Sequence, residues 1–379
     1  MTSQGSFKRA VRQRARATGQ RYTEARAVME QAGTSPFAGT RPFDVAGLTD
    51  HLKSQYGIGV TSVVPIDDDP ATRPRGSWPG HYPWTLIVKR DDAPPWVARV
   101  FSSPSDGVAR VEEDADILRF LATQGFPAER VAQDDAVSEV DGAAVLVTEF
   151  IRGGRPTDAV GRILSPAVTQ ELASLLGRLH ALPATSGASA RDGGSEEHDG
   201  GFFVGRPGRD LAAAMSFLLS VEDAVGPEGR DGFHYLRDHV EQADDAEGLP
   251  EAFTHSNYHA WAAVGAPGDL AIVGWAGSGR GPRLPAVAWL LRTAAEAGPD
   301  HVEAVIRGYR EHVQLTGEEL DRLPGVLEMR PLWLACLDYR ESVRRGSVPT
   351  IDRDGSGYGM FRPKVTDRLA AQVVASLSG

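Results

Sequence analysis

One short segment, residues 255–262, constrains this chain of 379 residues more than any other feature. It reads His-Ser-Asn-Tyr-His-Ala-Trp-Ala, and Ile-Val-Gly-Trp follows about ten residues later, at 272–275. Upstream, residues 175–183 end a helix-like pattern in Leu-His-Ala-Leu-Pro, and the apolar strand-like run 145–150 leads into Gly-Gly-Arg-Pro at 153–156. The order of these segments narrows the possible folds further than the composition does.

This series resembles the aminoglycoside phosphotransferases and the related choline kinase-like small-molecule kinases, over about residues 46–345. The resemblance implies an α+β, bilobal protein-kinase-like fold, with a small N-lobe built on an antiparallel sheet and a larger, mainly helical C-lobe. It also implies three parts: a basic helical N-terminal extension over 1–45, a kinase-like N-lobe over 46–152, and a helical C-lobe with a degenerate catalytic loop over 153–379.

The positions that carry the chemistry in that family are changed in this chain. Asn257 stands where the resemblance places the catalytic Asp, and an amide cannot take up the proton of a substrate hydroxyl. Ala262 and Gly274 stand at the positions of the two metal ligands, and neither offers a side-chain oxygen to a hard cation such as Mg²⁺. The sequence therefore predicts a defective metal site without a general base.

The expected nucleotide site also departs from the family. Arg99 fills the place of the phosphate-contacting base, and an Arg can still neutralise phosphate. Asp114, on the following helix, is the expected acidic partner of Arg99, although a surface carboxylate explains it equally well. Glu149, at the end of the strand before the hinge, is the remaining candidate for nucleotide contact. The loop 77–84 holds two Pro and two Trp, which predicts a poor cover for phosphates.

Two functions follow from these substitutions. The first is a catalytically inactive pseudokinase that acts as a binding or regulatory module, with no cofactor expected. The alternative is an active ATP-dependent small-molecule phosphotransferase, or another enzyme, whose chemistry has moved to other residues; ATP and Mg²⁺ would be its cofactors. His259 is the leading candidate base in that case, with His255 and Asp269 behind it, although a structural role for His259 is the simpler interpretation.

Charge and hydropathy restrict the partners. The net charge of −11 argues against nucleic acid as a general partner, although the first 31 residues carry seven Lys and Arg against two Glu and could form a basic arm for an acidic partner. The chain has no apolar run of 18 residues and no signal-like N-terminus, which predicts a cytoplasmic protein without membrane contact. The expected partner is a protein, or a small molecule between C-lobe helices predicted at 207–221, 230–243, 285–297, 300–314 and 317–343.

Overall fold

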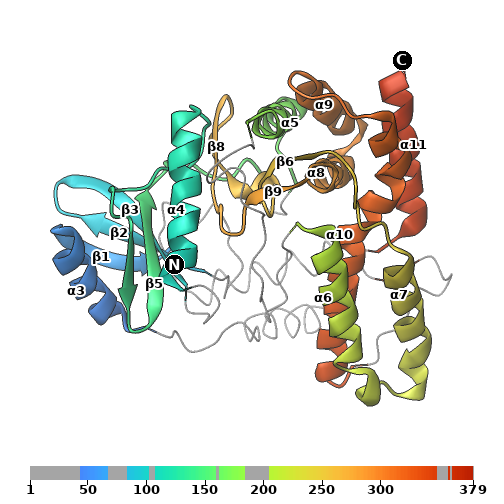
Figure 1. Ribbon diagram of the computed structural model, residues 1–379, viewed down its shortest axis with the longest axis horizontal. Coiled ribbons are helices and arrows are strands. Elements are labelled where there is room, and N and C mark those ends of the chain that lie inside the picture. The colour runs from blue at the N-terminus through green and yellow to red at the C-terminus, as the bar shows by residue number, and fades with distance from the viewer. Residues whose placement is uncertain are drawn as a thin grey trace.

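The computed structural model describes residues 43–66, 83–101, 107–158, 162–183, 205–347, 357–358 and 361–378. Within them the chain forms two lobes, a small one built on a sheet and a larger helical one (Figure 1). This is the α+β kinase-like architecture that the sequence predicted. The basic N-terminal arm and most of the aromatic loop over 77–84 lie outside the described residues.

The small lobe is an antiparallel sheet of five strands in the order β1-β2-β3-β5-β4. Its strands are β1 (Val60–Pro65), β2 (Trp84–Arg90), β3 (Ala93–Phe101), β4 (Val137–Val140) and β5 (Ala143–Glu149). Asp141 and Gly142 join β4 to β5, and both have positive φ angles, 51° and 77°, as a two-residue type I′ hairpin requires. Helices α3 (Val45–Tyr56) and α4 (Val108–Thr123) pack against this sheet.

The large lobe contains the helices that the hydrophobic pattern predicted. They are α5 (Pro166–His180), α6 (Pro207–Leu219), α7 (Arg230–Gln242), α8 (Leu284–Ala297), α9 (Pro299–Arg310), α10 (Gly317–Arg344) and α11 (Pro363–Ser378). The helix expected over 300–314 ends at Arg310, four residues early; the other predicted bounds agree within two residues. Short 3-10 turns, η3 (Glu222–Ala224) and η4 (Pro227–Gly229), connect α6 to α7. Among the described helices, none combines the length and apolar character needed to cross a membrane.

Two short two-stranded sheets carry the expected catalytic segment. Strand β6 (Glu251–Thr254) pairs with β9 (Gly279–Pro282), and β7 (Ala263–Ala266) forms a hairpin with β8 (Asp269–Ile272). The 3-10 turn η5 (Ala260–Ala262) lies between β6 and β7. The segment 255–262 therefore crosses from one sheet to the other, and β8 lies next to α4 of the small lobe in Figure 1.

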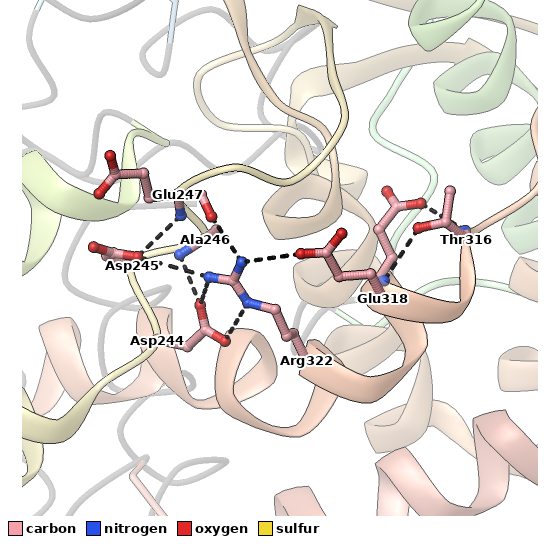
Figure 2. Close-up of polar contacts among 8 residues, drawn as sticks. Asp244, Asp245, Ala246, Glu247, Thr316, Glu318 and Arg322 are labelled. Atoms are coloured by element: carbon pink, nitrogen blue, oxygen red, sulfur yellow. Dashed lines mark hydrogen bonds and ion pairs between the residues drawn. The ribbon is translucent and has the colours of Figure 1, made fainter.

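Helix α10 is fixed at its start by polar contacts (Figure 2). Thr316 and Glu319 form a capping box, and Arg322 binds both carboxylate oxygens of Asp244 at 2.6 and 3.0 Å. Arg322 also donates to the carbonyl of Glu247 at 2.7 Å, so the loop before β6 is held against this helix. Because α10 continues into the region behind the catalytic segment, these contacts help to position the side chains that it places there.

Candidate active site

His255 fixes the catalytic segment to the strand end at 272–275. Its Nδ1 accepts a hydrogen bond from the Asn257 N–H at 3.1 Å, so Nε2 carries the proton and donates to the Val273 carbonyl at 3.2 Å. The ring meets the Trp275 ring edge to face at 4.7 Å. Burial lowers the pKa of His255 to about 4, although the hydrogen bond to Val273 opposes this shift. His255 is therefore neutral at pH 7 and both of its ring nitrogens are engaged, which makes it a structural residue.

Asn257, at the position of the lost catalytic Asp, contacts a cation instead of facing an open site. Nη2 of Arg330 donates to Oδ1 of Asn257 at 2.5 Å, and the same guanidinium lies 4.2 Å above the Trp289 ring. Desolvation lowers the pKa of Arg330 to about 9, with the charge of Asp210 partly offsetting it, so Arg330 is still charged at pH 7. The expected acceptor position therefore carries a positive charge where an active relative would carry a negative one.

The two expected metal positions offer only backbone atoms. Ala262 is buried, and its carbonyl accepts from the Val273 N–H at 2.7 Å. Gly274 has a φ of 82°, and its N–H donates to Oε1 of Glu129 at 2.8 Å. No group of three or more His, Cys, Asp or Glu side chains that could hold a metal ion occurs in the described part of the chain.

Glu129 is also the ion-pair partner of Arg99. Its Oε2 lies 2.6 Å from Nη1 of Arg99 and accepts from the Thr148 hydroxyl at 3.2 Å. The side chains of Glu129 and Arg99 are only 3% and 10% exposed. A buried ion pair is stable only when further hydrogen bonds satisfy its remaining lone pairs, and Thr148 and Gly274 supply them here. Glu129 therefore joins the expected phosphate-binding base to the expected metal position.

Asp114 is not the ion-pair partner that the described residues give to Arg99. Asp114 is buried on α4, and the ion pair of Arg99 is with Glu129, so a nucleotide-site role for Asp114 stays a prediction. The short backbone pairing of Ala128 with Ile272 explains the difference, because it brings Glu129 to the strand end that holds Gly274. Nothing in the spacing of the sequence indicated this contact.

The other sequence candidates occupy separate places. His259 caps η5, since its Nδ1 accepts from the Trp261 N–H at 3.0 Å. Glu149 ends β5 with an exposed side chain, and its N–H donates to the Arg130 carbonyl at 2.9 Å. Asp269 is exposed at the start of β8. The structure therefore forms two groups of contacting residues. Arg99 and Gly274 both contact Glu129, and Asn257 contacts Arg330. The sequence analysis did not indicate Glu129 or Arg330.

The segment 153–156, which follows β5 and is the expected hinge between the lobes, contacts the β7–β8 hairpin directly. The Gly265 N–H donates to the Gly154 carbonyl at 3.0 Å, and a Cβ atom on Gly153 would lie 2.9 Å from the Cα of Gly265. The Arg155 guanidinium lies 4.9 Å from the centre of the Trp261 ring. These contacts bring the segment after β5 against the β7–β8 hairpin.

The residues do not fit the Mg²⁺–nucleotide complex that kinase-like chemistry uses. Mg²⁺ requires oxygen ligands at octahedral positions, and Ala262 and Gly274 provide no side-chain oxygen. Arg99 is paired with Glu129, and active kinases hold such a cation–carboxylate pair beside the phosphates, so the misfit lies at the metal positions. Behind the catalytic segment, the cavity lined by His255, Trp289 and Arg330 has a volume of about 10 Å³, the space of a single water.

Comparison with known proteins agrees with the fold. The profile described as the phosphotransferase enzyme family matches residues 85–323, well over half of the chain. The chain belongs to this family. No curated protein sequence matches it significantly.

Several solved structures share the architecture at low sequence identity. The macrolide 2′-phosphotransferase of Brachybacterium faecium aligns with a TM-score of 0.51 and 17% identity, over 81% of this chain and 99% of that one. An amicoumacin kinase in complex with AMP-PNP, Ca²⁺ and Ami aligns with a TM-score of 0.53 and 13% identity, over 88% of this chain and 93% of that one. A spectinomycin phosphotransferase bound to ADP and spectinomycin aligns with a TM-score of 0.52 and 12% identity, over 89% and 100%. At these identities the similarity establishes the fold alone.

Proposed function

We propose that this protein is a catalytically inactive member of the phosphotransferase family, retained as a binding or regulatory module. One observation carries the proposal: neither expected metal position, Ala262 or Gly274, offers a side-chain oxygen, and the Gly274 N–H is bonded to Glu129. An active site of this kind needs side-chain oxygens for the metal beside its cation–carboxylate pair. The Arg99–Glu129 pair is present here, but Ala262 and Gly274 supply no metal ligand.

The acceptor side supports the same proposal. A general base must be able to accept a proton, and the Asn257 amide cannot. Its Oδ1 is bonded to the charged Arg330, which would disfavour a cationic acceptor by like-charge repulsion. Both halves of the reaction, phosphate activation and proton removal, therefore lack their groups. The partner in this proposal is a protein or a small molecule held by the large lobe in the cytoplasm.

The decisive test is thermal unfolding of the full chain with ATP, in Mg²⁺ and again in a chelator. A ligand at one hundred times its dissociation constant stabilises a fold by about 2.7 kcal/mol, a clearly measurable shift. We expect no shift of the unfolding midpoint for the unmodified protein in either condition. A Mg²⁺-dependent rise accompanied by ADP formation would overturn the proposal.

Two variants test whether such a rise in the unfolding midpoint depends on Glu129. Glu129→Gln keeps an oxygen for the Gly274 N–H but removes the charge, and Glu139→Gln changes an exposed residue of β4 as the matched control. A rise that disappears only in Glu129→Gln would identify Glu129 as a relocated metal ligand and the protein as an enzyme. A rise that survives both substitutions would place the metal on other residues, with the same conclusion.

A further inference from the structure

A second cavity, of about 170 Å³, lies inside the large lobe, away from the catalytic segment. It opens between α8, α9, the loop before α10, and α11, which gather on the side of the large lobe opposite the small lobe in Figure 1. Its walls are mostly apolar: Val287, Leu291, Val305, Ile306, Leu315 and Val373. None of its lining residues belongs to the candidate active site.

The cavity is a partly open pocket with an apolar base. Val287, Leu291, Val305 and Val373, which border this space, each have at most 2% of their surface exposed. Ligand pockets in proteins are typically concave and lined mainly by hydrophobic side chains. A space of this size next to a helix terminus has room for a small ligand.

Water is a poor occupant of the inner part. A buried water needs two to four polar partners, and the aliphatic walls provide none. The Tyr309 hydroxyl, the polar atom of the one aromatic lining residue, is hydrogen-bonded to Nδ1 of His180 at 2.9 Å. A cavity with such walls favours an apolar group, as an engineered cavity of about 150 Å³ favours benzene.

The mouth has a different character. Arg310 and Gln314 line it and are exposed, and the Gln314 carbonyl is held by Arg283 at 3.0 Å. Among the described residues, no carboxylate pairs with Arg310, and the adjacent Glu311 instead accepts from Ser174 and Gln170 at 2.7 and 2.9 Å. An apolar interior therefore ends at a cation that has no counter-ion from the described chain.

We propose that this cavity binds a small carboxylic acid with an apolar body. The body fills the space between α8, α9 and α11, and the carboxylate pairs with Arg310, whose planar guanidinium can donate two parallel hydrogen bonds to it. The Gln314 amide is placed to add a neutral hydrogen bond. This site is independent of the nucleotide cleft and goes beyond the proposed function.

Isothermal titration calorimetry of the full chain with octanoate tests the site, with octanol and octylamine as probes of the same length. We expect octanoate to bind with one site per chain, octanol to bind about tenfold more weakly, and octylamine not to bind. Absence of octanoate binding would overturn the proposal. Equal binding of octanoate and octylamine would overturn the role of Arg310.

Variants localise the binding. Val373→Phe fills part of the pocket, so we expect it to abolish octanoate binding and to leave the unfolding midpoint equal or higher, whereas Val374→Phe, at the next and exposed position of α11, should do neither. Arg310→Gln should weaken octanoate about tenfold and leave octanol unchanged. Arg368→Gln, an exposed Arg of α11, is its control. Unchanged octanoate affinity in both Val373→Phe and Arg310→Gln would place the ligand elsewhere and refute the proposal.

Because the ATP experiment concerns a separate cleft, the two proposals can fail independently. Loss of octanoate binding in Val373→Phe says nothing about nucleotide, and an ATP-induced shift would leave the cavity assignment intact.

Discussion

Arg330 donates a hydrogen bond to Oδ1 of Asn257 across 2.5 Å, so the position of the family's catalytic carboxylate is in contact with a buried cation. The replacement of Asp by Asn is therefore not an isolated loss. An Asp at this position would form an ion pair with Arg330, and an opposite charge at that distance lowers a carboxylate pKa and makes it a weaker base. The proton affinity of a carboxylate placed at position 257 would therefore depend on Arg330.

Restoring the three lost residues alone should not restore activity. We expect the variant with Asn257→Asp, Ala262→Asn and Gly274→Asp to form no detectable ADP, because Arg330 would still pair with the restored carboxylate at position 257. Gly274 also has a φ of 82°, which strains any side chain placed there. Adding Arg330→Met should raise Mg²⁺-dependent ADP formation by about a hundredfold, the scale of a general base.

A matched substitution checks the cause of that gain. Arg344→Met changes an exposed Arg of α10 and should leave the restored variant inactive. If the three restorations alone gave as much ADP as the variant that also carries Arg330→Met, Arg330 would have no inhibitory role.

His255 should make stability depend on pH in a defined window. Burial lowers its folded pKa to about 4 from an ordinary 6.5, so the unfolded chain binds the proton more readily between these values. Stability from neutral His255 is complete above pH 6.5 and is lost as the pH falls toward 4. Each such His contributes a slope of about 1.4 kcal/mol per pH unit, and His180, with a pKa lowered to about 3 by burial, adds to it.

Denaturant unfolding between about pH 5 and 6.5 measures this slope. His255→Gln should flatten it by about 1.4 kcal/mol per pH unit, while His234→Gln, on the exposed face of α7, should not change it. Equal slopes for His255→Gln and the unmodified protein would show that His255 is charged in the fold.

The Asp244–Arg322 pair should stabilise the start of α10. Partial burial raises the pKa of Asp244, but the hydrogen bonds from Arg322 and the Ala246 N–H and the charge of Arg322 outweigh burial, so the pKa lies below 3.8. Its contribution is present above that value and is lost as the pH falls below it. We expect Asp244→Asn to reduce the free energy of unfolding at pH 7 by about 1 kcal/mol.

Asp245 provides the control for this pair. Its carboxylate is 3.7 Å from the same guanidinium and 51% exposed (Figure 2), so Asp245→Asn should cost less than about 0.5 kcal/mol. If the two substitutions reduced the free energy of unfolding equally, the two hydrogen bonds between Arg322 and Asp244 would add nothing to a solvent-screened charge attraction.

The sequence predicted the fold well because its segments carry strong local signals. The helices from α6 to α10 follow continuous apolar periodicity, and the tail helix α11 buries Leu369 and Val373, four residues apart, against α8, α9 and α10. That Ala262 and Gly274 offer no side-chain oxygen is also evident from the sequence alone, while their assignment as metal positions stays a prediction.

The partners of the site residues could not be predicted in the same way. Glu129 lies in an irregular stretch after α4 and reaches Arg99 only because Ala128 pairs with Ile272, more than a hundred residues later. Arg330 is one of several Arg residues on a long helix, and its contact with Asn257 depends on how α10 crosses behind the catalytic segment. Both contacts arise from long-range packing, which no short motif records.

Glu328 should destabilise the protein above neutral pH. It is half-buried on α10, where burial first and the charge of Asp367 on α11 second raise its pKa to about 7 from 4.5. The fold therefore binds the proton more readily than the unfolded chain, so stability is complete below pH 4.5 and falls as the pH rises through 7. Glu328→Gln mimics the protonated form and should raise the unfolding midpoint at about pH 8 but not at about pH 4.5. Glu303→Gln, exposed on α9, should change neither, and a lower midpoint for Glu328→Gln at the higher pH would show that this carboxylate is stabilised in its charged form.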